Sequence, residues 1–246
     1  MSKFDIDQSV VNLALKRLLE RAHELKQKRL PIHHVLDPYA AGLESIVFDY
    51  SWPTDWLEIE RRRVNQKALM NYLGDFQQEI IGALPGWKSY SSGTGNSDVV
   101  GRRGSQKILG EIKNKYNTLN SASSKSTYRS LAMFLSQPEY ANHIAVVATI
   151  LAKPLKDRMW KEFAPGEDSP SRPDILLMSG RVFYAFACDP DERLPEINVK
   201  NNSNMRAWPS WFAIDAMAET VWSAMQEEAG YGVPQPIRDL VLKSFG

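Results

Sequence analysis

The chain has 246 residues, of which 43% are hydrophobic, and its formal net charge at pH 7 is +1. This length accommodates one large domain with a sizeable core, and the net charge does not by itself indicate a nucleic-acid-binding protein. The single cysteine, Cys188, excludes an internal disulfide and a cysteine-based zinc site. The first residues lack an apolar signal core, and no apolar run approaches transmembrane length, so we expect a cytoplasmic protein without a membrane partner.

Two long helices are predicted in the first third of the chain. Apolar residues recur at helical spacing from Asp7 to Arg29 and again from Asp55 to Ala83. The aromatic-rich segment 39–57 is interpreted as packing between helices, with base stacking as the alternative. The cationic run Arg61–Arg63 is interpreted as a solvated helix face, with phosphate contact as the alternative.

The central feature of the sequence is a predicted β-hairpin. Residues 96–100 and 107–113 are typical of two short strands, and a turn bounded by two glycines joins them. Because side chains alternate between the faces of a strand, Glu111 and Lys113 share one face of the second strand. The hairpin would place Asp98 across from the part of that strand that ends at Glu111.

Two carboxylates and one ammonium in this arrangement suit metal-dependent hydrolysis of phosphodiesters. Asp98 and Glu111 can hold a hard divalent cation such as Mg²⁺, which keeps some of its waters and takes a phosphate oxygen as a further ligand. Lys113 can then orient or deprotonate the attacking water and offset the developing negative charge. The alternative is that Glu111 and Lys113 form a solvated pair on an edge strand.

At these residues the sequence resembles the PD-(D/E)XK nuclease superfamily. Asp98 corresponds to the aspartate of the motif, and Glu111-Ile112-Lys113 to its second half; Ser97 stands where the motif has proline. The run Glu-Ile-Lys-Asn-Lys-Tyr-Asn-Thr further resembles type II restriction endonucleases of the group that cuts interrupted GG…CC sites. The resemblance covers residues 95–120, with support from the order of elements as far as about Cys188.

The resemblance implies Mg²⁺-dependent, sequence-specific hydrolysis of double-stranded DNA that leaves 5′-phosphate ends, at a GGNCC-like site. It also implies a homodimer, because a palindromic target presents equivalent bonds on its two strands, and a cognate DNA methyltransferase that protects host DNA. Related nucleases often carry a supporting acidic residue on the helix before the sheet. Glu79 is the candidate for this auxiliary metal or water contact, and a plain exposed glutamate is the alternative.

Basic residues gather around the predicted site. Residues 101–130 contain seven lysines and arginines against one acidic residue, Glu111. Such a patch suits a phosphate backbone, and the polar run 114–127 has the donors and acceptors that read base edges; ordinary surface loops are the alternative. The DNA-binding candidates are Arg102, Arg103, Asn114, Lys115, Asn117 and Lys125.

Downstream residues complete an α/β pattern. A helix is predicted from residue 126 or 127 to Ser136, and the apolar run Asn142–Ala152 predicts a buried strand parallel to the one before the helix. Two more strands are predicted over Asp174–Ser179 and Arg181–Cys188, and an amphipathic helix over Trp208–Glu228.

These elements predict an α/β fold with a restriction-endonuclease-like mixed central sheet, flanked by helices, with N-terminal and C-terminal helical additions. We expect a single endonuclease domain over residues 1–246. Its parts would be a mainly helical region (1–85), a catalytic α/β core (86–190) and a C-terminal loop with helices (191–246).

Two other functions remain open at this point. A structure-specific or repair nuclease of the same superfamily would use the same three residues on branched or damaged DNA. A DNA-binding module without catalysis would use the basic patch alone, and the intact Asp98, Glu111 and Lys113 argue against it.

Overall fold

The structure is a computed structural model. It describes residues 8–28, 37–90, 97–103, 106–115, 118–151, 161–163, 170, 172–188 and 223. The chain divides into two units, Lys16–Leu73 and a second that combines Met1–Leu15 with Gly74–Gly246. The helix predicted over residues 208–228 lies, apart from residue 223, outside the described residues.

The helices that precede the sheet follow the apolar periodicity of the sequence. α1 spans Gln8–Gln27 and α4 spans Thr54–Gly82, which confirms the two long helices. Between them lies α3 (Pro38–Val47), whose N-cap residue Asp37 accepts hydrogen bonds from the backbone N–H groups of the first turn. None of the helices in the described part of the chain is both long and apolar enough to cross a bilayer.

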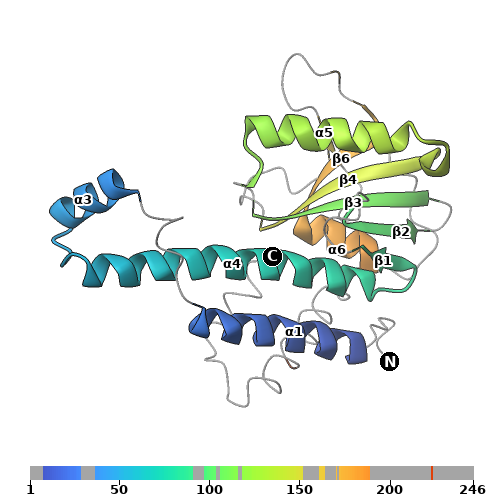
Figure 1. The fold of residues 1–246 in the computed structure, drawn as a ribbon. Coiled ribbons are helices and arrows are strands. Elements are labelled where there is room, and N and C mark those ends of the chain that lie inside the picture. The colour runs from blue at the N-terminus through green and yellow to red at the C-terminus, as the bar shows by residue number, and fades with distance from the viewer. Residues whose placement is uncertain are drawn as a thin grey trace. The chain divides into compact units, whose positions relative to one another are not determined.

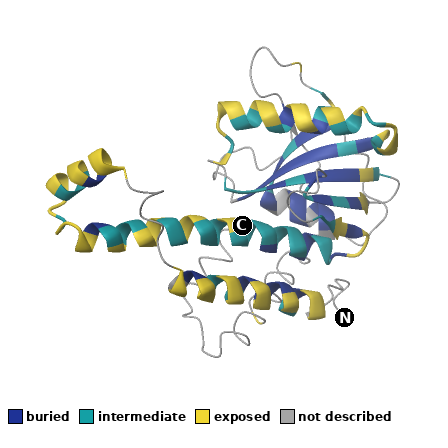
Figure 2. Cartoon of the chain, viewed as in Figure 1, coloured by how far each residue is buried: buried dark blue, intermediate teal, exposed yellow. Residues whose placement is uncertain are grey.

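The aromatic residues around α3 differ in burial. Trp56 is buried, as expected for a residue that packs between helices. Tyr39, Phe48 and Trp52 are 88%, 58% and 55% exposed, so the packing interpretation was wrong for these three side chains. α3 is itself mostly exposed (Figure 2).

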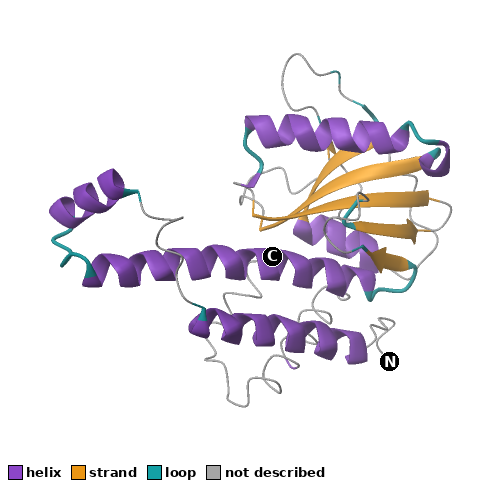
Figure 3. Cartoon of the chain, in the orientation of Figure 1, coloured by secondary structure: helices purple, strands orange, loops and turns teal. Residues whose placement is uncertain are grey.

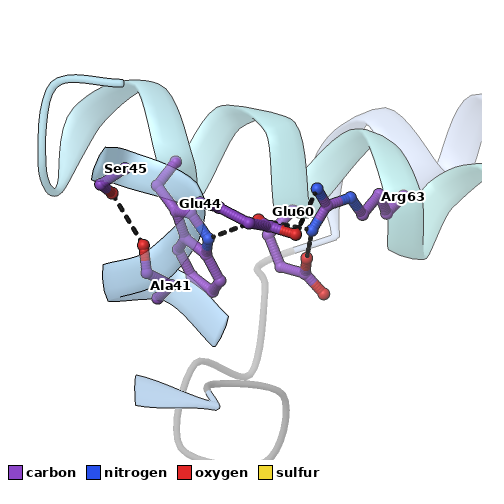
Figure 4. A network of polar contacts seen from close by, with 6 residues as sticks. Ala41, Glu44, Ser45, Glu60 and Arg63 are labelled. Atoms are coloured by element: carbon purple, nitrogen blue, oxygen red, sulfur yellow. Dashed lines mark hydrogen bonds and ion pairs between the residues drawn. The ribbon is translucent and has the colours of Figure 1, made fainter. Parts of the chain in front are cut away.

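That anchor joins α3 to α4 through one carboxylate (Figure 4). Glu44 accepts a hydrogen bond from the Trp56 indole Nε1 at 3.1 Å and forms an ion pair with Arg63 at 2.9 Å. Arg63 also pairs with Glu60 at 3.1 Å. These contacts hold the Glu44 carboxyl pKa below its usual value, mainly through the hydrogen bond from Arg63. The charge of Arg63 is therefore paired with two carboxylates of its own unit.

The second unit is built on a mixed sheet with the strand order β1-β2-β3-β4-β6-β5 (Figures 1 and 3). The strands are β1 (Trp87–Ser89), β2 (Val99–Arg103), β3 (Gln106–Lys115), β4 (His143–Leu151), β5 (Lys161–Glu162) and β6 (Ile175–Ser179). β1, β2 and β3 are antiparallel neighbours, β3, β4 and β6 are parallel, and β5 is antiparallel to β6. The predicted hairpin and the predicted parallel crossover are both confirmed. The first strand was predicted over residues 96–100, but β2 continues through Gly101 to Arg103, so the turn is shorter than predicted.

The crossover between β3 and β4 contains α5 (Ser121–Leu135), which begins earlier than the sequence predicted. Asn120 caps it by accepting a hydrogen bond from the backbone N–H of Ser123 at 2.8 Å. The first turns of α5 are polar and largely exposed, so apolar periodicity gave no signal there. The polar run after the hairpin is therefore partly helical, and Lys125 lies on α5.

The segment after β6 forms a helix, α6 (Gly180–Cys188), and the strand predicted over residues 181–188 was wrong. Phe183, Phe186 and Ala187 are buried at helical spacing. Trp87 of β1 packs edge-on against Phe183, with ring centroids 5.4 Å apart. A short apolar aromatic run fits a buried strand or a buried helix equally well, and packing against Trp87 favours the helix.

The two faces of the sheet carry different helices. α5 packs on a core cluster that includes Tyr128, Leu131, Leu109 and Val147. On the other side of the sheet, α6 contributes Phe183, which lies against Gly110 of β3 (Figure 1). Because α5 and α6 cover the two faces with apolar side chains, polar side chains are more easily accommodated at the carboxyl ends of the parallel strands.

Candidate active site

The β2–β3 hairpin brings the predicted residues together. Val99 pairs with Gly110 in the antiparallel register, which makes Asp98 and Glu111 the next facing positions. The Asp98 carboxylate oxygen Oδ2 accepts a hydrogen bond from the backbone N–H of Ile112 at 2.7 Å. The predicted position of Asp98, across from the end of the strand that carries Glu111, is confirmed.

Two glycines let the strands of this hairpin pack closely. A Cβ atom on Gly110 would lie 2.5 Å from the Val99 side chain. A Cβ atom on Gly101 would lie 2.3 Å from the Trp87 ring. Real side-chain contacts are not this short, so both positions require glycine if the neighbouring strands keep their places.

Glu111 and Lys113 lie on the same face of β3 and pair with each other. Their Nζ–Oε1 distance is 2.6 Å, and each side chain is about a quarter exposed (26% for Lys113 and 23% for Glu111). Ile112, between them, is buried on the opposite face. The alternation predicted from the sequence is therefore present, and the pair is partly shielded from solvent.

The environment of Asp98 raises the pKa of its carboxyl to about 6. Burial is the largest cause, because it disfavours the charged form, and the negative charge of Glu111 adds to it. The hydrogen bond from the Ile112 backbone and the charge of Lys113 act in the opposite direction. Asp98 is thus held near its titration point at moderately acidic pH, where a bound cation would favour the carboxylate.

An acidic residue of α4 that the sequence reading did not select also acts on Asp98. The charge of Asp75 raises the pKa of Asp98 further. Glu79, the predicted auxiliary residue, follows one helical turn later on α4 and is half-buried. Asp75 and Glu79 are four residues apart, so they lie on the same side of the helix. By sequence spacing, Asp75 was therefore as good a candidate as Glu79. The auxiliary role of Glu79 stays a prediction.

The donor set suits a hard cation that keeps water ligands. Within the described ranges, no group of three or more His, Cys, Asp or Glu side chains is arranged to hold a metal by itself. Asp98 and Glu111 supply carboxylate oxygens on facing positions, and Mg²⁺ commonly binds through one or two carboxylates together with water and phosphate oxygens. The residues present therefore fit such an ion in the presence of substrate.

The basic candidates divide between the two ends of the hairpin. Asn114 and Lys115 directly follow Lys113, and Lys115 shares the face of Glu111 and Lys113. Arg102 is exposed and pairs with Lys107, about 13 Å along the strand from Glu111 at ~3.3 Å per residue.

Three further candidates are placed less fully. Lys125 is exposed on α5, and Arg103 ends β2. The side chain of Arg103 and the whole of Asn117 lie outside the described part.

Comparison with known proteins decides the family. The family model of the Eco47II restriction endonuclease matches residues 2–200. The chain belongs to this family. This membership confirms the resemblance and the α/β fold class, and it makes the protein a type II restriction endonuclease, a hydrolase that cleaves DNA at specific sites.

Two curated relatives of this endonuclease extend the match. The type II restriction enzyme Eco47II of Escherichia coli is 25% identical over 249 residues, which cover 98% of this chain and 95% of that protein. The type II restriction enzyme Sau96I of Staphylococcus aureus is 26% identical over 151 residues, or 58% of this chain and 56% of that protein. Enzymes of this class generally use a divalent metal ion and act on double-stranded DNA.

Proposed function

We propose that this endonuclease hydrolyses DNA with Mg²⁺, using Asp98 and Glu111 as metal ligands and Lys113 beside the attacking water. The observation that supports this most directly is the shared face of the β2–β3 hairpin, where the Lys113 ammonium lies 2.6 Å from the Glu111 carboxylate. The hydrogen bond from Ile112 to Asp98 orients the second carboxylate toward the same region. The two carboxylates and the ammonium thus meet without any rearrangement of the backbone.

Each residue has a separate task in this proposal. Asp98 and Glu111 would hold the ion, which supplies charge stabilisation for the phosphate and a lowered pKa for a bound water. Lys113 would orient that water and offset the charge that develops on the phosphate oxygens. In-line attack on phosphorus would give a 3′ hydroxyl and a 5′ phosphate.

The Glu111–Lys113 ion pair also indicates how charge is balanced in the site before a metal ion binds. With no ion bound, Lys113 neutralises Glu111, so the carboxylate is stabilised in a partly buried position. With an ion held by Glu111, the ammonium would lose part of that attraction and would be free to contact the phosphate. We infer that the pair acts as an internal counter-ion in the absence of metal.

The finer features rest on the resemblance and on the relatives. We propose a GGNCC-like target, a two-fold homodimer in which each subunit cuts one strand, and a cognate methyltransferase as functional partner. Of the DNA-binding candidates, Asn114 and Lys115 would contact the DNA next to Lys113, and Arg102 would contact it further along the hairpin. Arg103, Asn117 and Lys125 are proposed as further DNA contacts. We also propose that residues 1–246 act as one endonuclease, with residues 86–190 as the catalytic core.

The first test is digestion of unmethylated phage DNA by the purified protein, with Mg²⁺ or with EDTA. Discrete, Mg²⁺-dependent fragments are expected, and sequencing their ends gives the site and the cut position. Cutting confined to branched substrates would overturn the site-specific activity in favour of a structure-specific nuclease. Salt-sensitive DNA binding without cleavage would leave only a binding module.

A matched pair of variants then tests the assignment of Lys113. Lys113→Ala should lower the single-turnover rate by at least about a hundredfold, because it removes a positive group at the reacting phosphate. Lys107→Ala removes an exposed lysine from the same strand, at the end away from Asp98, and should leave the rate near that of the wild type. Equal losses in both variants would contradict the assignment.

A further inference from the structure

One row of the parallel strands carries a polar side chain on every strand. Lys113 of β3 pairs in register with Thr149 of β4, and Thr149 pairs with Ser179 of β6. Residues paired in register on parallel strands lie on the same face of the sheet, about 4.8 Å apart. The row therefore continues the face of Glu111 and Lys113 across the middle of the sheet.

Thr149 stands out from the rest of its strand. The neighbouring β4 residues Val147, Ala148 and Ile150 are apolar and buried, and Thr149 itself is only 7% exposed. Valine has the same shape as threonine and suits a central strand at least as well, so packing does not explain a hydroxyl here. A hydroxyl in such a place needs a polar partner, because its burial without one is unfavourable.

The residue beside Thr149 in the row offers that partner. The Lys113 ammonium has three N–H donors, of which the pair with Glu111 uses one. A threonine hydroxyl has two acceptor lone pairs and can receive one of the others. Thr149 comes from the central parallel strand, flanked by β3 and β6, so its backbone is fixed on both sides.

We propose that Thr149 is a positioning residue for Lys113. Its hydroxyl accepts a hydrogen bond from the ammonium when Glu111 is engaged with a metal ion, and so keeps Lys113 aimed at the reacting phosphate. Ser179, the next polar residue in the row, lies on the far side of Thr149 and continues the polar environment toward the end of β6. This inference rests on the proposed role of Lys113 and adds a residue that no motif of the sequence indicates.

The test compares three variants of the full-length protein. Thr149→Val keeps the shape and removes the hydroxyl, and Thr149→Ser keeps the hydroxyl and removes the methyl. Thr54→Val makes the same exchange as Thr149→Val at the exposed first residue of α4, outside the sheet. Single-turnover cleavage at saturating Mg²⁺ gives the rate of the chemical step, a gel shift in EDTA gives DNA affinity, and thermal unfolding gives stability.

We expect Thr149→Val to cleave about tenfold to a hundredfold more slowly, as a misplaced catalytic group does. DNA affinity and melting temperature should stay near those of the wild type. Thr149→Ser should recover most of the rate, and Thr54→Val should show no loss.

Two results would overturn the inference. A wild-type rate in Thr149→Val would show that the hydroxyl has no part in the reaction. A loss of rate in Thr149→Val that Thr149→Ser does not recover would show that Thr149 acts only through packing. A loss of rate accompanied by a matching decrease in melting temperature would show the same. Failure of the wild-type protein to cleave DNA with Mg²⁺ would instead overturn the proposed function, so the two failures are distinguishable.

Discussion

The Asp98 carboxylate accepts a hydrogen bond from the backbone N–H of Ile112 at 2.7 Å. This contact joins β2 to β3 at the point where the antiparallel pairing ends, and Ile112 lies between Glu111 and Lys113. The same amide thus ties the first carboxylate to the strand that carries the other two residues. Because one carboxylate oxygen of Asp98 is held by this hydrogen bond, the orientation of the other oxygen is also fixed, as a metal ligand requires.

The raised pKa of Asp98 predicts how cleavage depends on pH. The pKa of its carboxyl is about 6, mainly because of burial, and a protonated carboxyl is a poor metal ligand. At subsaturating Mg²⁺ we expect the cleavage rate to rise about tenfold per pH unit below about 6 and to level off above it. The measurement is a single-turnover pH profile. A profile that is flat from pH 5 to pH 7 would contradict the role of Asp98.

The same shift makes a prediction about stability. The Asp98 pKa is raised from 3.8 to about 6, so the folded state binds this proton more tightly than the unfolded state. The stability that this proton contributes is present below about pH 4 and is lost as the pH rises to about 6. Asp98→Asn carries no charge at any pH. In EDTA it should be more stable than the wild type at pH 7.5, by about 3 kcal/mol at most at ~1.4 kcal/mol per pKa unit.

Urea unfolding at two pH values checks this expectation. At pH 4 the stabilities of Asp98→Asn and the wild type should converge, because Asp98 is then largely protonated in both states. Asp98→Asn should also lack cleavage activity, so a gain in stability accompanies a loss of function. A variant less stable than the wild type at pH 7.5 would show that the carboxylate is not a destabilising charge.

Asp75 offers a way to change the Asp98 pKa from another element. Its negative charge raises that pKa, so Asp75→Asn should move the acidic limb of the pH profile to lower pH. Glu79→Gln is the comparison on the same helix and should reduce the cleavage rate itself if Glu79 is the auxiliary residue. An unchanged acidic limb in Asp75→Asn would show that its charge does not act on the site.

The aromatic packing of α6 predicts a purely structural variant. Phe183 is fully buried and packs edge-on against Trp87. Phe183→Ala should lower the free energy of unfolding by about 3–5 kcal/mol, the range for truncating a buried aromatic residue. Urea or thermal unfolding measures this loss. A cost below about 1 kcal/mol would mean that Phe183 is not part of the core.

The hairpin could be predicted because its signals are local. Alternating apolar and polar residues define the two strands, and the glycines mark where they turn and approach. The pairing of Asp98 with the Glu111 region follows from strand register alone. The buried strand β4 was equally clear, since its apolar run is too continuous for a solvated element.

The rest depended on contacts that a sequence pattern does not contain. The strand predicted for α6 was wrong because Phe183 and its neighbours are apolar in either structure, and the choice is made by packing against Trp87. The spacing of Asp75 and Glu79 fitted both residues, and only the course of α4 past the sheet shows that the charge of Asp75 acts on Asp98. Thr149 was hidden inside an apolar run, and its link to Lys113 appears only in the strand register.

The close approach at Gly101 and Gly110 has a consequence for variation in this enzyme. Any larger side chain at either position must move Trp87 or Val99, and with them the strands that carry Asp98 and Glu111. A genetic selection for cells that survive an unprotected copy of the gene should therefore return inactivating substitutions at these two glycines as well as at the carboxylates. The tolerance of the hairpin to mutation is limited by the space between its strands as much as by its chemistry.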